Sequence, residues 1–88
     1  MPSQNVIVKN KLGIHARPAA QFVKTASNYS CDIRVEKDEE EVDGKSIMGL
    51  MMLAAGYESQ LVITTEGDDE ADALQALVSL IESNFDEN

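Results

Sequence analysis

The only histidine of the chain, His15, stands in the stretch GIHARPAA, two residues before Arg17. A neutral imidazole has a nucleophilic lone pair and can accept a phosphoryl group. We predict that a helix starts just after His15, and the first N–H groups of a helix have no partner inside it and attract anions. The planar guanidinium of Arg17 matches the oxygens of a phosphate. Together these features favour phosphoryl transfer as the chemistry of this segment.

Other roles for His15 rest on weaker support. A lone histidine before a helix is, on its own, most simply a polar loop residue or a helix cap. A metal site is not predicted, because there is no second histidine and the only cysteine, Cys31, is far away in the sequence. A serine-hydrolase triad is not indicated, because nothing in the spacing supplies a placed nucleophile and an orienting acid.

A second segment, DGKSIMGLMML, predicts a short helix with Ser46 as its N-cap and Gly56 as its end. Its apolar residues fall on two faces, one with Ile47, Met48 and Met51 and the other with Leu50, Leu53 and Ala54. Two faces do not easily pack into one core, so one of them is expected to be an exposed docking surface; the alternative is a deeply embedded helix. Phosphorylation of Ser46 suits a helix start and adds about two negative charges beside that surface.

The remaining pattern predicts the elements that position these two segments. An apolar stripe formed by Ala19, Phe22, Val23 and Ala26 indicates a helix over residues 16–27, and residues 68–85 carry the longest stripe. Strands are expected at residues 5–10, 31–37 and 60–67, with a brief strand near Val42 after an acidic turn. The order β-α-β-β-α-β-α predicts an α+β fold, an antiparallel sheet with helices on one face.

Chain length, net charge and cysteine count limit the class of protein. The 88 residues suffice for one small domain, expected over 1–88. The net charge of −9 divides into +4 over residues 1–31 and −13 over the rest, which argues against a nucleic-acid partner and favours an anion or acidic partner near His15. The lone Cys31 excludes an internal disulfide, and neither a signal peptide nor a membrane span is apparent, so we expect a cytoplasmic protein.

The motifs GIHARPAA and GKSIMGLMML, at this separation in a chain of this length, resemble the HPr family, the histidine-containing phosphocarriers of the bacterial sugar phosphotransferase system. The resemblance implies an open-faced β-sandwich, with four antiparallel strands covered by three helices. It implies that Nδ1 of His15 takes a phosphoryl group from enzyme I, which draws on phosphoenolpyruvate, and passes it to enzyme IIA domains. Arg17 would steady the phosphate, and no cofactor is implied.

The resemblance also implies a partner surface and a regulatory site. The family positions that form the docking surface match Ala20, Lys24, Ile47, Met48 and Met51. Ser46 matches the site where an ATP-dependent kinase, the HPr kinase/phosphorylase, slows the transfer to His15. Transcriptional regulators are possible partners of the modified form, and a monomer is expected.

The chain departs from the family pattern at the acidic run Asp38 to Glu41, where many members have an Asn-Gly turn, and Gly56 comes slightly early. The acidic run puts recognition by the kinase in doubt. Two further readings therefore stay open. The chain could be chiefly a regulatory binding module switched at Ser46, or a nitrogen-type relative that uses the same His15 chemistry with other partners.

Overall fold

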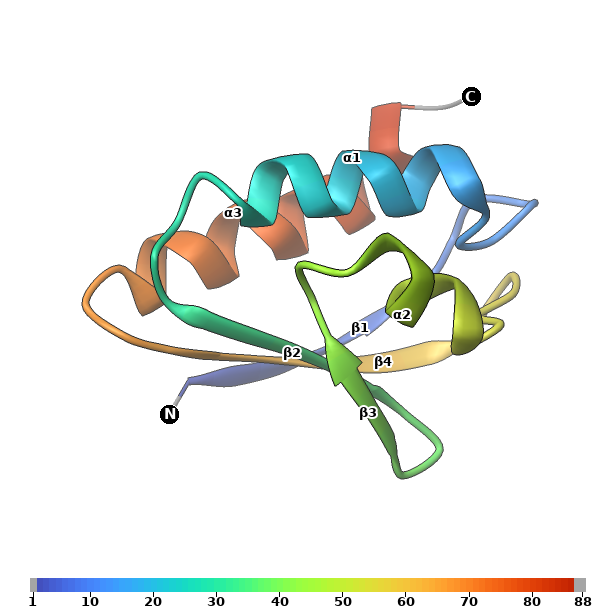
Figure 1. The fold of residues 1–88 in the computed structure, drawn as a ribbon. Coiled ribbons are helices and arrows are strands. Elements are labelled where there is room, and N and C mark those ends of the chain that lie inside the picture. The colour runs from blue at the N-terminus through green and yellow to red at the C-terminus, as the bar shows by residue number, and fades with distance from the viewer. Residues whose placement is uncertain (1, 87–88) are drawn as a thin grey trace.

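Four strands and three helices follow one another in the predicted β-α-β-β-α-β-α order (Figure 1). The computed structural model describes residues 2–86. Its elements are β1 (Ser3–Ile7), α1 (Ala16–Ala26), β2 (Asp32–Lys37), β3 (Glu40–Asp43), α2 (Ile47–Met52), β4 (Gln60–Glu66) and α3 (Glu70–Glu82), followed by a 3₁₀ turn (Asn84–Asp86). No helix within residues 2–86 is both long and apolar enough to cross a bilayer.

The strands form one antiparallel sheet in the order β1-β4-β2-β3, and the three helices lie on the same side of it (Figure 1). Alternation along the central strands explains this arrangement. Ile33 and Val35 of β2 and Leu61 and Ile63 of β4 are buried, while the residues between them lie on the open face. The predicted fold, a four-stranded antiparallel sheet covered on one face by three helices, is confirmed.

Each helix buries one side against the sheet. Phe22 of α1, Leu50 of α2 and Ile81 of α3 belong to a single core cluster with the inward residues of the strands. Full burial of a side chain of this size contributes about 1.5–3 kcal/mol. The core therefore fixes the orientation of α1 and α2, which also contact each other.

The first strand lies earlier than residues 5–10. β1 runs from Ser3 to Ile7. Val8 lies beyond the strand, and its N–H donates a hydrogen bond to Ser59 O at 2.9 Å. The prediction was wrong at Lys9 and Asn10 because the chain turns there instead of continuing along β4. The first helix matches more closely, ending at Ala26 with Ser27 as its C-cap.

The second helix is shorter than predicted. α2 ends at Met52 with Leu53 as its C-cap, so Gly56 does not end it. The stop is made by Ala54, which adopts the left-handed conformation with φ of +52°. A glycine usually occupies that position, so the sequence pattern placed the end two residues too late.

The last helix is trimmed at both ends relative to the predicted residues 68–85. α3 starts at Glu70 with Asp69 as its N-cap, and it ends at Glu82. Of the predicted stripe, Leu74 is only partly buried, and Ala73 takes its place in the core. Phe85 lies beyond the helix with φ of +56° but is fully buried, as expected of a core residue.

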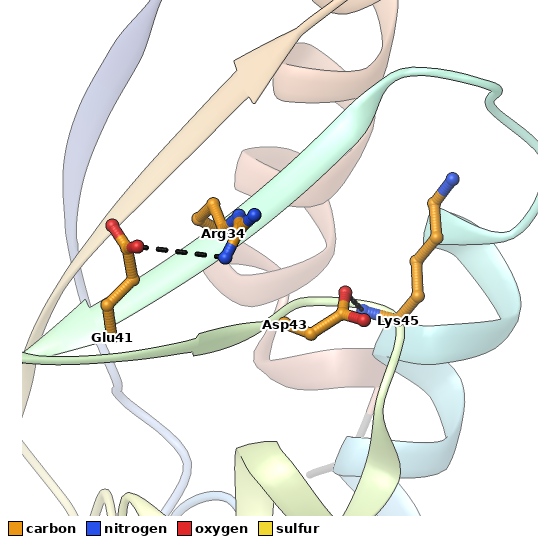
Figure 2. Close-up of polar contacts among 4 residues, drawn as sticks. All are labelled: Arg34, Glu41, Asp43 and Lys45. Atoms are coloured by element: carbon orange, nitrogen blue, oxygen red, sulfur yellow. Dashed lines mark hydrogen bonds and ion pairs between the residues drawn. The ribbon is translucent and has the colours of Figure 1, made fainter.

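The acidic run forms the turn of the β2–β3 hairpin. Lys37 pairs with Glu40, so Asp38 and Glu39 are the two loop residues, and their φ angles are +51° and +71°. Such a turn favours Asn and Gly, and acidic side chains with positive φ strain it. Its charge is only partly balanced, by a 3.3 Å ion pair between Lys37 and Asp38 and by a 3.8 Å pair between Arg34 and Glu41 (Figure 2).

Candidate functional site

His15 is the N-cap of α1 and is half-buried. Its backbone is extended, with φ of −99° and ψ of −168°, and its carbonyl accepts the first helical hydrogen bond from Ala19 N at 3.0 Å. The imidazole makes no hydrogen bond to the first turn of its own helix, unlike the side chain of an ordinary N-cap. The residue thus stands at the helix start without serving as its side-chain cap.

The first turn of α1 presents backbone donors of the kind that favour an anion. The backbone N–H groups of Ala16 and Arg17 occupy positions where a helix offers no internal acceptor. The next residue, Pro18, lacks an N–H and is buried, so it adds rigidity without another unpaired donor. A phosphoryl group on His15 would meet two N–H donors and the positive end of the helix dipole.

One face of α1 continues this surface. Arg17, Ala20 and Lys24 are all exposed and follow one another at spacings of three and four residues. Residues at such spacings share one side of a helix. Two cations therefore flank the exposed Ala20 on the same side of the helix that starts at His15.

The loop that carries His15 is attached to the segment that follows α2. Ile14 N donates to Ala55 O at 2.8 Å. Gly13 has φ of +71° and packs so closely that a Cβ would overlap Ala55 O and lie 2.7 Å from Gly56 Cα. Residues about forty positions apart in the chain are thereby in contact, and the start of α1 lies beside the end of α2.

Ser46 is the N-cap of α2, as predicted. Its hydroxyl accepts from Gly49 N at 3.0 Å, and its own N–H donates to Asp43 O at 3.1 Å. The preceding turn is held by Asp43, whose carboxylate accepts from Lys45 N at 2.9 Å (Figure 2). The side chain of Lys45 points away, and its Nζ donates to Tyr29 O at 2.8 Å. Ser46 is therefore a capping residue in a well-braced turn.

The exposed face of α2 is apolar. Ile47, Met48 and Met51 are 41, 74 and 44% exposed, whereas Leu50 and Leu53 are buried in the core. The two faces inferred from the sequence are thus separated except at Ala54, which the sequence placed with Leu50 and Leu53 but which is exposed. The exposed Met52, which the sequence did not assign to either face, extends the apolar side.

Cys31 takes no part in this site. It is buried at the start of β2, as the sequence predicts, and burial raises the pKa of its thiol, with a further contribution from the nearby Asp69 carboxylate. That carboxylate accepts from Ser30 N at 2.8 Å and from Cys31 N at 3.0 Å. These bonds, the one from Ser30 foremost, hold the pKa of Asp69 below its ordinary value.

The described residues bring together most of the positions that the sequence singled out. His15 and Arg17 share the start of α1, Ala20 and Lys24 follow on its exposed side, and α1 contacts the helix that carries Ile47, Met48 and Met51. Ser46 stands at the opposite end of α2 from the Ala55 contact. Within residues 2–86, no three His, Cys, Asp or Glu side chains gather in a way that could hold a metal ion.

Sequence reasoning missed Asn10. This residue is buried, and its Nδ2 donates to Gly13 O at 2.6 Å. The signal that could have found it is the pair Asn10 and Gly13, two turn-forming residue types three positions apart immediately before His15. The β-branched run that precedes Asn10 favoured a strand instead.

Known proteins of the HPr family are similar to this chain over nearly its whole length. The family model described as PTS HPr component phosphorylation site matches residues 2–83. A phosphocarrier protein HPr of Pseudomonas aeruginosa is 53% identical over 88 residues, covering 99% of this chain and 98% of that protein. An HPr-like protein Crh of Halalkalibacterium halodurans is 49% identical over 82 residues, covering 93% of this chain and 98% of that protein.

Solved structures agree with the fold. A crystal structure of HPr from Thermoanaerobacter tengcongensis superposes with a TM-score of 0.96 at 51% identity, covering 100% of this chain and 99% of that one. A second crystal structure from the same organism, described as an HPr dimer, has a TM-score of 0.79 at 52% identity, covering 99% of this chain and 100% of that one. Because similar chains include a dimer, the expectation of a monomer is not supported.

Proposed function

Because the chain belongs to the HPr phosphocarrier family of the phosphotransferase system, we propose that His15 accepts a phosphoryl group from enzyme I and passes it to enzyme IIA domains. The observation that carries the proposal is the position of His15, at a helix start whose side-chain cap it does not provide, two residues before Arg17. Phosphoenolpyruvate is the ultimate donor.

The chemistry is a direct displacement at phosphorus. The lone pair of Nδ1, the nitrogen implied by the family resemblance, attacks the phosphorus of the enzyme I phosphohistidine. The new N–P bond forms as the old one breaks, and the imidazole of enzyme I leaves with the electron pair. The N–H groups of Ala16 and Arg17 and the guanidinium of Arg17 stabilise the charge on the phosphoryl oxygens. Onward transfer to another histidine repeats the exchange in the opposite direction.

The protein acts as a carrier rather than as an enzyme in its own right. A phosphoramidate on one histidine is close in energy to one on another, so positioning and charge stabilisation suffice. In this proposal the exposed side of α1 with Ala20 and Lys24, and the apolar side of α2 with Ile47, Met48 and Met51, form the docking surface for both partners. We place the protein in the cytoplasm, where phosphoenolpyruvate and ATP are available, and propose one domain over residues 1–88.

Ser46 is proposed as a regulatory phosphorylation site. Its hydroxyl lies beside the apolar face of α2, so a phosphate there places about two negative charges next to the docking surface. A partner with an acidic rim is then repelled, while the start of α2 tolerates the charge. The exposed carboxylates of the β2–β3 hairpin precede Ser46 closely in sequence, so the kinase must accept an acidic neighbourhood.

The second candidate function is a regulatory binding module whose Ser46-phosphorylated form docks on a transcriptional regulator. The apolar exposed face of α2 beside Ser46 favours it. The presence of His15 at the start of α1 favours the carrier as the primary role, because a module switched only at Ser46 does not need an imidazole there.

The test is intact mass after incubation with phosphoenolpyruvate and enzyme I. We expect a gain of one phosphate, roughly 80 Da, which is lost on acid treatment and absent in His15→Ala. The Ser46→Ala variant is the matched control and should gain the same mass. Normal labelling of His15→Ala, or no labelling of the wild-type chain by active enzyme I, would sink the proposal.

A further inference from the structure

Asn10 is a buried polar residue in the connection between β1 and α1. It is 6% exposed, and its Nδ2 donates to Gly13 O at 2.6 Å. Burial of a primary amide costs free energy that only good hydrogen bonds offset. The hydrogen bond to Gly13 O is a contact of this kind.

The carbonyl of Gly13 joins Asn10 to His15. Gly13 O accepts two hydrogen bonds, one from Asn10 Nδ2 and one from His15 N at 3.1 Å. Gly13 N in turn donates to Asn10 O at 3.0 Å. The amide thus fixes the very carbonyl that holds the backbone N–H of His15.

This link matters because α1 lacks the usual means of fixing its start. In most helices the N-cap side chain bonds to the first turn and holds the cap backbone in its extended conformation. The His15 imidazole makes no such bond, yet its backbone is extended, with φ of −99° and ψ of −168°. From outside the helix, the backbone N–H of His15 is held by Gly13 O.

We propose that Asn10 is a positioning residue for phosphoryl transfer, acting through Gly13 O to set the place of His15 at the start of α1. The inference rests on the proposed function, since it takes His15 as the phosphoryl acceptor. The hydrogen bonds from Asn10 to Gly13 O and from His15 N to Gly13 O, here called the Asn10 clamp, take the place of a side-chain cap. The imidazole therefore does not have to cap α1, and the N–H groups of Ala16 and Arg17 remain on the side of the phosphoryl group.

A second anchor limits what the loss of the clamp does. Ile14 N donates to Ala55 O at 2.8 Å, and Gly13 packs against Gly56, so the loop stays attached to the segment after α2 without the Asn10 amide. We therefore expect Asn10→Ala to fold, with the His15 backbone less tightly held. Displacement of a reacting group by about 1 Å costs on the order of 100-fold in rate.

The experiment measures single-turnover transfer from phosphorylated enzyme I for the full chain. Asn10→Ala removes the amide, and Asn10→Asp keeps its shape but replaces the donor by a carboxylate that cannot donate to Gly13 O. We expect both to lower the maximal transfer rate about 10- to 100-fold, with KM unchanged because Asn10 lies outside the proposed docking surface on α1 and α2. Asn5→Ala, at an exposed position in β1, is the matched control and should transfer like the wild type.

The split between rate and KM separates positioning from folding. Rates are compared at a temperature where circular dichroism shows each variant fully folded, so a purely structural role leaves the maximal rate at the wild-type value. A wild-type maximal rate for either Asn10 variant overturns this inference while the proposed function stands. If the wild-type chain itself accepts no phosphoryl group from active enzyme I, the proposed function and this inference both fail.

Discussion

The helices that start at His15 and at Ser46 are held by different means. Ser46 caps α2 with its own hydroxyl, which accepts from Gly49 N at 3.0 Å. His15 caps α1 only with its backbone, and the loop before it supplies the restraint through Gly13 and Ile14. A side chain that takes part in capping is tied to its helix, whereas the His15 imidazole makes no capping bond to the first turn of α1. The two proposed phosphorylation positions thus each lie at a helix start. They differ in whether the native side chain caps the helix.

This difference has a consequence for how the two positions depend on their surroundings. The hydrogen bonds of Ser46 itself are local, because Asp43, Ser46 and Gly49 lie within seven residues. The start of α1 also depends on a distant segment, because Ile14 N bonds to Ala55 O. Substitutions in the loop after α2 should therefore disturb the position of His15 more than substitutions around Ser46 disturb it.

The largest expected effect comes from Gly13→Ala. The residue has φ of +71°, and its Cβ would overlap Ala55 O. The left-handed backbone costs about 1–2 kcal/mol and the overlap about 1–3 kcal/mol. We expect urea unfolding to show a loss of about 3 kcal/mol, accompanied by slower transfer to His15.

Gly56→Ala is the matched control for that change. A Cβ at Gly56 meets no atom within 4 Å. We expect its free energy of unfolding to stay the same or rise by up to about 1 kcal/mol. Equal losses for the two variants would show that the His15 loop is not held against Ala55 as described.

A smaller effect is expected at the other helix start. Ser46→Ala removes the hydroxyl that accepts from Gly49 N, and loss of such a cap costs about 1 kcal/mol. ATP-dependent labelling by the cognate kinase should disappear, while labelling of His15 from phosphoenolpyruvate should persist. Ser3→Ala, on the exposed side of β1, controls for the serine itself. If Ser46→Ala also blocked labelling of His15, the two helix starts would not be independent.

The smallest expected effect concerns the third helix start, where Asp69 also leaves its own helix without a side-chain cap and bonds instead to Ser30 N and Cys31 N. Since these bonds hold the pKa of Asp69 below its ordinary value, their stabilisation is present above about pH 4 and is lost as the pH falls through the lowered value. Asp69→Asn should therefore be less stable than the wild type at pH 7, with the difference shrinking in acid.

Urea midpoints at pH 7, 4 and 3 measure this effect, with Asp68→Asn as the neighbouring control. A wild-type chain and an Asp69→Asn variant whose stabilities fell in parallel across that range would contradict the assignment. Cys31, buried next to this carboxylate with a raised thiol pKa, provides a second check, since it should react slowly with thiol reagents in the folded chain.

The type of each element was predictable because its pattern is local. The alternation of Cys31, Ile33 and Val35 and the stripe of Ala19, Phe22, Val23 and Ala26 each report one buried side. The structure buries all of these residues except Val23, which is partly buried. Element ends were less predictable. Ala54 adopts a left-handed conformation that a sequence pattern assigns to glycine, so the end of α2 was placed at Gly56.

In the candidate site, too, local features were predictable from the sequence and contacts between distant segments were not. His15 with Arg17, and Ser46 with the apolar residues after it, are neighbours in the sequence, so residue types and spacing sufficed to single them out. The contact between Gly13 and the segment at Ala55 joins distant parts of the chain, and no periodicity reports it. Asn10 was missed although its contact with Gly13 O is local, because the β-branched run before it favoured a strand.

The most direct test of the central claim is to locate the phosphoryl group in the intact chain by fragmentation mass spectrometry at alkaline pH, after reaction with phosphoenolpyruvate and enzyme I. We predict a single acid-labile phosphate on His15, with Ser46 unmodified. An acid-stable phosphate on Ser46, or a phosphate at any residue other than His15, would contradict the claim that the helix start at His15 is the phosphoryl acceptor.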